Sequence, residues 1–373
     1  MKSALIIGGG IGGLSAAIAL RQAGMDVDLV EISAGREVYH VGIIVQSNFI
    51  RALDRLGVAD AAIARGYPYE GFNLCGVDGE TIVHIPGVHL SRDGHPTDLG
   101  LTRPALHDIL SDKCQQWGVS PRFGVTFSNI QQDADGVDVT FTDGTSGRYD
   151  IVIGADGLFS KVRSTLFDPD LKPRYTGQAV WRYNLPRPAD VTCTALYQGA
   201  SGGKAGYCPL TDETMYLLLV MREPGNPWIP KDQLAAAFKE RLRPFGGKVG
   251  EFRDTVDLDP SKIVYRPLEV AFVKAPWHRG RVLLIGDAAH ATTPHLGQGA
   301  AQAVEDAVTL GELVGTHATH QDVFDHFMAR RYERCKFIWE NSIQIGQWEL
   351  DDDPAADVEG VSRRVLETVS SPL

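Results

Sequence analysis

The first thirty residues carry the pattern that most constrains how this chain can fold. A largely apolar run from Ser3 to Ile7 is followed by closely spaced glycines. Such a run is typical of a strand that is buried on both faces of a parallel sheet. A helix is predicted from Leu14 to Ala23, Gly24 closes it, and Val27 to Glu31 reads as a second strand. The pattern therefore predicts a β-α-β unit of a Rossmann-like α/β sheet.

The glycines between strand and helix have the spacing of a dinucleotide-binding turn. Gly8 permits the tight turn, Gly10 lets the backbone approach a pyrophosphate, and Gly13 lets helix and strand pack closely. The helix N-terminus then faces the anion. Glu31 ends the second strand, where a carboxylate can accept hydrogen bonds from ribose hydroxyls, and Ile32 follows it at the same site. These residues predict dinucleotide binding but do not distinguish FAD from NAD.

Composition narrows the classes of partner. The 373 residues carry a formal net charge of −11, which argues against nucleic-acid and anionic-membrane binding, since both need clustered cations. The five cysteines form no CxxC pair, so we expect neither a disulfide framework nor a metal site, and a reducing cytoplasm suits them. No apolar run approaches the roughly 20 residues of a membrane span, and the glycines argue against a secretory signal. We expect a cytoplasmic protein that acts on small molecules, without a nucleic-acid or membrane partner.

The pattern of secondary-structure signals changes twice along the chain. Residues 174–267 are rich in strand signals broken by Pro and Gly, and a buried-strand pattern returns after them. We predict a dinucleotide-binding domain made of residues 1–173 and 268–320, with a second, β-sheet-rich substrate domain at 174–267. Residues 321–373 are expected to form a C-terminal helical region and tail.

Two distant motifs accompany the glycine turn. Residues 150–163 read DIVIGADGLFSKVR, and residues 281–299 read RVLLIGDAAHATTPHLGQG. These segments resemble the DG and GD motifs of the FAD-dependent aromatic-ring monooxygenases, the single-component class A flavoprotein hydroxylases that include salicylate and hydroxynicotinate hydroxylases. The three motifs stand in the family's order and span most of the chain. The resemblance implies that the bound dinucleotide is FAD.

The resemblance also implies a set of residues that contact FAD. Asp287 would bind the ribityl chain, and Arg103, at the start of a helix, would pair with phosphate. The backbone N–H groups at the helix start after Gly297 would stabilise negative charge on the reduced flavin. The full set implied is Arg103, Phe127, Asp156, Gly157, Gly286, Asp287, Gly297, Gln298, Gly299 and Ala300. Phe127 would face the adenine through its backbone, and the Asp156-Gly157 pair would also help NAD(P)H to dock.

One segment departs from the family pattern. Relatives carry a small GAG-type turn near the flavin, whereas this chain has His40-Val41-Gly42-Ile43 and retains only Gly42. A bulkier loop there would change flavin mobility or the shape of the pocket.

The implied reaction hydroxylates a small hydroxylated aromatic or N-heteroaromatic substrate, which could carry a carboxylate. The sequence has only one dinucleotide-binding glycine turn, so NAD(P)H would bind transiently. O2 would react through a flavin C4a-hydroperoxide. We call residues 294–299, which follow the GD motif, the flavin loop. His295, which follows Pro294 in this loop, is the first candidate to deprotonate the substrate. Tyr216 is a candidate substrate contact in the β-rich domain. Weaker candidates from the same sheet are Trp181, Arg182, Tyr207 and Cys208, of which Arg182 would suit an acidic substrate.

Two other classes of function stay open at this point. The first is a halogenase or a reductase of the same fold, although the GWxWxIP stretch usual in flavin-dependent halogenases is absent. The second is a non-enzymatic flavin-binding module, which would keep the glycine turn but has no reason to keep the segment from Pro294 to Gly299. The sequence does not predict the oligomeric state.

Overall fold

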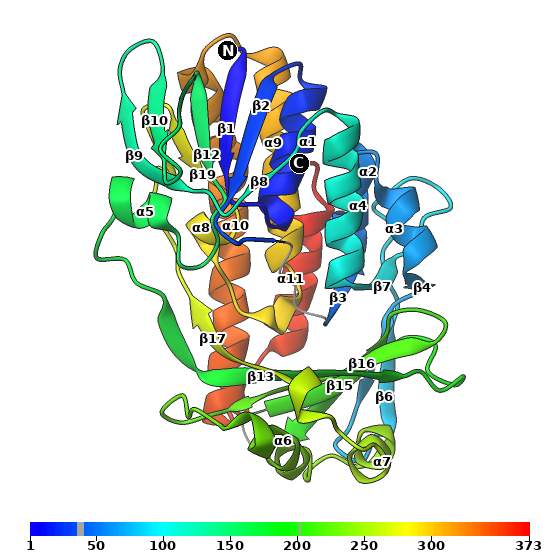
Figure 1. Cartoon of the computed structure of the whole chain (residues 1–373). Coiled ribbons are helices and arrows are strands. Elements are labelled where there is room, and N and C mark those ends of the chain that lie inside the picture. Colours follow the sequence, from blue (N-terminus) through cyan, green and yellow to red (C-terminus); the bar gives the residue numbers. More distant parts are fainter. Residues whose placement is uncertain (36–40, 201–202) are drawn as a thin grey trace.

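The computed structural model describes residues 1–35, 41–200 and 203–373, and its first sheet holds the N-terminal pattern (Figure 1). The strand order of this sheet is β18 (His278–Arg279), β19 (Val282–Leu284), β12 (Ile151–Gly154), β1 (Ser3–Ile7), β2 (Asp26–Glu31) and β8 (Arg122–Phe123). All neighbours pair in parallel except β18 and β19. Parallel strands end at the same edge of a sheet, so the segments after β1, β2, β12 and β19 meet there. All three sequence motifs thus reach one place.

Helices cover both large sheets and connect their strands. In chain order they are α1 (Ile11–Gln22), α2 (Ser47–Arg55), α3 (Ala59–Arg65), α4 (Arg103–Gln116), α5 (Lys161–Leu166), α6 (Leu234–Arg241), α7 (Gly247–Thr255), α8 (Asp287–His290), α9 (Gly299–Thr316), α10 (His320–Asp351) and α11 (Val358–Ser370), with short 3-10 turns η1 (Lys231–Gln233), η2 (Pro260–Lys262) and η3 (Pro294–Leu296). Helix α1 packs against both α4 and α9. It begins at Ile11, three residues before the predicted start, because Gly10 already serves as its extended N-cap.

Two small sheets fill the space beside the first. Strand β7 (Asp98–Thr102) pairs antiparallel with β3 (Gly42–Gln46) and with β4 (Tyr67–Tyr69). The other small sheet has the order β11 (Ser146–Tyr149), β10 (Val137–Phe141) and β9 (Phe127–Gln132). Its turn between β10 and β11 contains the Asp-Gly pair of the sequence at Asp143.

A seven-stranded sheet forms the lower layer in Figure 1. Its order is β17 (Val264–Val270), β13 (Arg174–Pro186), β16 (Thr214–Arg222), β15 (Gly203–Pro209), β14 (Thr194–Ala200), β5 (Phe72–Cys75) and β6 (Thr81–Ile85). One face packs on α6 and α7, where the Trp181 and Phe238 rings stack with centroids 5.6 Å apart. Side chains alternate along a strand, so the neighbours of Trp181 face the opposite way, toward the first sheet.

The C-terminal part of the chain bridges the two layers. Helix α10 contacts both α9 and β13. It ends at Asp351, and Asp352 follows as its C-cap in the left-handed region with φ 49°. Helix α11 was not anticipated within the predicted tail. Its residues Val361, Val365 and Val369 recur at helical spacing and pack on α10.

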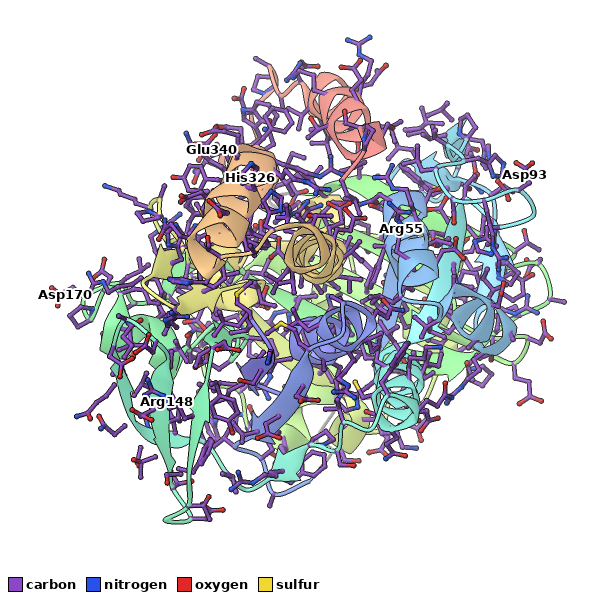
Figure 2. All side chains as sticks on the ribbon, turned by 90° about the horizontal axis from the view of Figure 1, so that it is seen from above. Arg55, Asp93, Arg148, Asp170, His326 and Glu340 are labelled. Carbon is purple, nitrogen blue, oxygen red and sulfur yellow. The ribbon has the colours of Figure 1, made fainter. Side chains whose placement is uncertain are left out.

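The predicted α/β class, with a Rossmann-like first sheet, a second sheet and C-terminal helices, is confirmed. The predicted domain limits stay a prediction; β5 and β6, from residues 72–85, extend the sheet built mainly from 174–267. Charged side chains such as Asp93, Arg148 and Asp170 lie at the rim of the molecule (Figure 2). Within the described residues, no helix has both the length and the hydropathy to cross a membrane.

Candidate cofactor and substrate site

A cavity of about 1490 Å³ lies between the two large sheets. Pockets for a single drug-sized ligand span roughly 300–1,000 Å³, so this one has room for a dinucleotide and a second molecule. Most of the residues predicted for the site line it: Gly10, Glu31, Arg103, Gly157, Tyr216, Gly286, Asp287, Pro294, His295, Gly297, Gln298, Gly299 and Ala300. Gly8, Gly13, Ile32, Phe127 and Asp156 are not among the lining residues.

The glycine turn has the geometry that a dinucleotide requires. Gly8 has φ +113°, and a Cβ there would lie 2.4 Å from the carbonyl oxygen of Ala155. A Cβ on Gly13 would lie 1.9 Å from the carbonyl oxygen of Gly8, so neither position tolerates a side chain. Gly10, in contrast, has no atom within 4 Å of its Cβ position and lies open to the cavity. No side chain caps α1, so its first N–H groups are available to an anion.

Glu31 is fixed at the end of β2. Its carboxylate oxygens accept hydrogen bonds from the backbone N–H of Gly9, at 2.7 Å, and of Ser33, at 2.8 Å. Each oxygen keeps further lone-pair capacity toward the cavity, which suits two ribose hydroxyls. The next residue, Ile32, points away, with 69% of its surface exposed.

The DG segment contributes mainly through its backbone. Asp156 accepts from the Ser160 hydroxyl and from the Val162 N–H at 3.0 Å, and so caps α5. Burial raises the pKa of Asp156 despite these hydrogen bonds. Gly157, with φ +74°, is the member of the pair that lines the cavity. Phe127 is buried, and its carbonyl accepts from Lys161 Nζ at 2.6 Å rather than facing the cavity.

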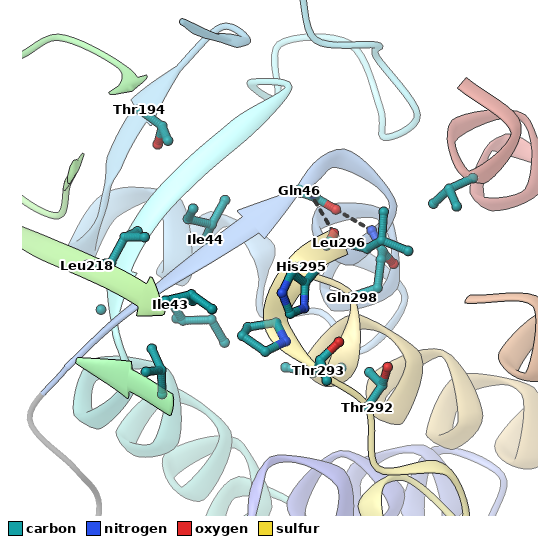
Figure 3. Close-up of a pocket in the computed structure, with 18 of the residues that line it drawn as sticks. Ile43, Ile44, Gln46, Thr194, Leu218, Thr292, Thr293, His295, Leu296 and Gln298 are labelled. Carbon is teal, nitrogen blue, oxygen red and sulfur yellow. Dashed lines mark hydrogen bonds between the residues drawn. The ribbon is translucent and has the colours of Figure 1, made fainter. Parts of the chain in front are cut away.

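The GD segment and the loop after it form the opposite end of the cavity. Asp287 is exposed to the cavity at the start of α8, behind Gly286 with φ +57°. Gly297 is left-handed, with φ +67°, and α9 begins two residues later. The side chains of Gln298 and Asn48 exchange hydrogen bonds of 2.9 and 3.1 Å. Gln298 Nε2 also donates to Gln46 Oε1, and Gln46 Nε2 donates to the carbonyl oxygen of Leu296 at 3.3 Å (Figure 3).

Two arginines and a tyrosine face the cavity from different elements. Arg103 begins α4, and Arg182 and Tyr216 lie on β13 and β16. Burial and the charge of Arg103 lower the pKa of Arg182 to about 10. Within the described part of the chain, neither arginine has an ion-pair partner. The carboxylate of Asp287 is close enough to raise the pKa of Arg103, although burial lowers it overall. Two half-buried cations that form no ion pair among the described residues favour an anionic ligand.

The segment from His40 to Ile43 departs from the family's GAG-type turn. His40 lies outside the described residues, whereas Val41, Gly42 and Ile43 are described. Gly42 packs beneath the Tyr216 ring, where a Cβ would lie 2.1 Å from Tyr216 Cδ1. Ile43 lines the cavity beside Leu218, across from the 292–298 loop (Figure 3). The retained glycine therefore positions a side chain that belongs to the cavity wall.

His295 belongs to a polar cluster whose residues come from four elements, η3, α10, β15 and β13. Its Nε2 lies 3.1 Å from Glu349 Oε2, while Lys204 Nζ and Gln178 Nε2 donate to the same carboxylate at 2.9 and 3.0 Å. Burial and Lys204 lower the pKa of His295, although Glu349 raises it. Burial opposes ionisation of Glu349, but Lys204 and His295 outweigh it and lower its pKa.

The directions of these pKa shifts define the protonation states of His295 and Glu349 near neutral pH: the imidazole is neutral and the carboxylate is ionised. An ionised carboxylate only accepts, so the neutral imidazole carries its proton on Nε2. Nδ1 then holds a free lone pair; it is buried and has no hydrogen-bond partner among the described residues. The His295 side chain as a whole has 0% exposure, so Nδ1 lies beneath the cavity surface.

The four weaker candidates from the second sheet lie on different sides of it, because side chains alternate along a strand. Arg182 lines the cavity, whereas Trp181 faces α6 and donates to Glu223 Oε1 at 3.1 Å. Tyr207 packs on the same far face, and Cys208 is buried against Tyr69. Only Arg182 of these four reaches the site.

A second buried cluster lies behind the flavin loop. His290 Nε2 lies 2.7 Å from Asp306 Oδ2, and Cys335 is close to both. Arg331 Nε donates to the other oxygen of Asp306 at 2.7 Å, and Arg331 Nη1 donates to Glu305 at 2.8 Å. Arg334 also pairs with Glu305, so the two arginines and the two carboxylates form a buried ion network.

Sequence reasoning did not find the polar residues of the cavity wall that support the predicted site residues. Glu349 and Lys204 come from α10 and β15, and no local motif marks either of them. His107, on α4, places its Nε2 3.0 Å from the carbonyl oxygen of Gly9 and supports the glycine turn. Its position four residues after Arg103, on the same helix, is the one signal that could have indicated it.

Comparison with known proteins agrees with this geometry. The family described as "FAD binding domain" matches residues 1–342. The 2-heptyl-3-hydroxy-4(1H)-quinolone synthase of Pseudomonas aeruginosa is 33% identical over 92% of this chain and 90% of its own. The 6-hydroxynicotinate 3-monooxygenase of Pseudomonas fluorescens is 28% identical over 94% and 92%.

A solved structure extends the likeness to three dimensions. Klebsiella pneumoniae HpxO complexed with FAD and uric acid superposes with a TM-score of 0.87 and 26% identity, covering 100% of this chain and 97% of that one.

Proposed function

Because this chain belongs to the FAD-dependent aromatic-ring monooxygenases, we propose that it hydroxylates a small hydroxylated aromatic or N-heteroaromatic compound with NAD(P)H and O2. The supporting observation is a single cavity that joins the dinucleotide turn, the loop at 286–300 and polar side chains of the second sheet. Two of the relatives are named for N-heteroaromatic compounds, which supports the same class of substrate here.

The residues present fit FAD. Gly10 and the uncapped start of α1 suit the pyrophosphate, and Glu31 suits the adenosine ribose. Asp287 and the fixed loop from Gly297 to Ala300 would hold the flavin end. When bound, FAD would take electrons from NAD(P)H and supply the activated oxygen.

We assign His295 the role of general base for the substrate hydroxyl. With Nε2–H donating to Glu349, the lone pair of Nδ1 is directed elsewhere and can accept a proton. A buried acceptor without a partner costs about 1–3 kcal/mol, which a substrate hydroxyl would relieve. Because Nδ1 lies beneath the cavity surface, this role requires a shift of the residues around His295 when substrate binds, while the hydrogen bonds of Gln298 hold the following part of the loop.

Arg182, with Arg103 near it, would hold the anionic oxygen or carboxylate of the substrate. A nearby cation stabilises a phenolate, and an aromatic ring whose hydroxyl group has lost its proton is more electron-rich. Tyr216 lies on the same wall and would contact the ring or donate a hydrogen bond to it. Helix α10 supplies Glu349 from behind the loop, as an orienting residue for His295.

A screen of purified protein tests this proposal. The protein should carry the flavin absorbance bands and oxidise NAD(P)H faster with a phenolic or hydroxypyridine acid, and the product should gain one oxygen atom. A colourless protein, or one whose NADH oxidation responds to no aromatic compound, would contradict it. Halogenation or reduction of the added compound would instead indicate the alternative reactions of this fold.

A further inference from the structure

A row of apolar side chains leads from the cavity to the edge of the seven-stranded sheet. Leu218 pairs with Gly206 across β16 and β15, Gly206 with Leu196 of β14, and Leu196 with Leu74 of β5. Leu74 then pairs with Val83 of β6. Side chains directly opposite each other lie on the same face of a sheet, and the four residues with side chains all line the cavity.

The row starts at the proposed anion site. Arg182 pairs with Leu218, so the arginine occupies the inner end of the row. From Leu218 to Val83 the row crosses four inter-strand spacings of about 4.8 Å, or roughly 19 Å in all. This length exceeds a bicyclic ring and leaves room for a chain attached to it.

Exposure rises along the row. Leu218 is 8% exposed, whereas Val83 is 45% exposed at the edge of the sheet. Val88 and Leu366 are 38% and 39% exposed, and both line the same cavity. Partly exposed apolar side chains that line a cavity mark a binding surface for an apolar group.

Helix α11 forms the facing wall and is held in place. Val365, Leu366 and Val369 line the cavity from this helix. Arg51 Nη2 donates to the carbonyl oxygen of Val369 at 2.9 Å, and Arg334 Nη2 donates to the same oxygen at 3.1 Å. Cations at the carbonyl end of a helix stabilise it, so the wall is fixed. Glu359 and Arg363 give this apolar groove a polar rim.

We propose, resting on the proposed function, that the substrate carries a flexible apolar tail, such as an alkyl chain, which lies in this groove. The ring would then sit between Arg182 and the flavin loop, and the tail would follow Leu218, Leu196 and Leu74 toward Val83. The continuity of the groove with the reaction cavity favours a tail of the substrate itself over a separate ligand or protein.

Paired compounds with and without a chain test the proposal. The probes are 4-hydroxyquinoline with 2-heptyl-4-hydroxyquinoline, and resorcinol with 4-hexylresorcinol. Each buried CH2 contributes about 0.8 kcal/mol, or about fourfold in affinity, so two or more buried methylenes predict a KM at least about tenfold lower for the alkylated partner. Equal KM values within both pairs would overturn the proposal.

Adjacent residues of β6 supply a matched pair of variants. Val83→Asp places a charge in the groove and should raise the KM of the alkylated compounds about tenfold, since it opposes burial of the chain. Ile82→Asp is the control, because Ile82 is 69% exposed, lies at a bulge of the same strand and is not among the residues that line the cavity. Identical effects of both variants would assign the preference to general hydrophobicity and reject the groove.

A binding measurement separates this proposal from the proposed function. Dissociation constants from the perturbed flavin spectrum report on the groove even without turnover. If no probe is hydroxylated but the alkylated ones bind more tightly, and only Val83→Asp removes the difference, the groove stands and the assigned reaction fails. If probes are hydroxylated without a chain preference, the reaction stands and the groove fails.

Discussion

Replacing Glu349 by Gln removes the charge that orients His295 while keeping a side chain of the same shape. In the native protein the carboxylate accepts from His295 at 3.1 Å and from Lys204 at 2.9 Å. The amide of Gln can accept through its oxygen or donate through its nitrogen. In the second case the proton of the imidazole moves to Nδ1, which can then no longer act as a base.

The expected size of the effect comes from the hydrogen bond that changes. A bond to a charged group contributes about 1.5–3 kcal/mol, and a neutral one about 0.5–1.5 kcal/mol. The loss of about 1–2 kcal/mol predicts a fall of about 5- to 30-fold in substrate-stimulated turnover. His295→Ala should lower substrate-stimulated turnover further, because removing a general base lowers the rate about 10²–10⁴-fold.

The pH dependence gives a second, independent readout. A base works in its neutral form, so turnover rises with pH through the pKa of His295. Burial and Lys204 lower this pKa, and Glu349 raises it. Without the carboxylate the pKa falls further, so the acidic limb of the profile of kcat should move to lower pH in Glu349→Gln.

The assay is NAD(P)H oxidation coupled to product formation, across pH, with native protein and both variants. Glu333→Gln is the control, since Glu333 lies on the same helix with its side chain 80% exposed. Thermal unfolding should be measured alongside, because Lys204 also loses a partner. A folded Glu349→Gln protein with native kcat and an unmoved acidic limb would refute the role of this pair.

Three further predictions follow from the site and its supports. Glu31→Ala removes the acceptor of two backbone N–H groups and should raise the Kd of FAD about 5- to 160-fold, at about 0.5–1.5 kcal/mol for each bond; Asp26→Ala, exposed on the same strand, should leave it unchanged in a fluorescence titration. Arg331→Met leaves buried carboxylates without their cation and should destabilise the fold by about 3–5 kcal/mol in denaturant unfolding, and a native unfolding midpoint would contradict the structural role of the network. Gly42→Ala should displace the Tyr216 ring and raise the substrate KM while FAD stays bound; a native KM would show that this contact does not shape the pocket.

The sequence predicts the glycine turn and the meeting of its three motifs because their constraints are local. Gly8 and Gly13 approach other backbone atoms so closely that no side chain fits, and this requirement is visible in the residue types. Strands that end in motifs must bring them to one edge of a parallel sheet. The predicted family, the FAD cofactor and the class of enzyme are confirmed by the matches to known proteins.

Other features depend on packing between distant segments. Strand β5 joins the second sheet through parallel pairing with β14, as in Asn73 with Ala195, and no local pattern specifies such a partner. Glu349 reaches His295 only because α10 crosses behind the flavin loop. Helix α11 is different, since Val361, Val365 and Val369 recur at helical spacing and carry a local signal, which the prediction of a tail for this region did not use.

The central claim is that one oxygen atom of O2 is transferred to a substrate held in the cavity beside FAD. Turnover under oxygen-18 gas, followed by mass spectrometry of the product, tests it most directly. The account predicts one oxygen-18 atom in each product molecule and consumption of one NAD(P)H for each. A product that contains no oxygen-18, or NAD(P)H oxidation that yields only hydrogen peroxide with every aromatic compound tested, would contradict it.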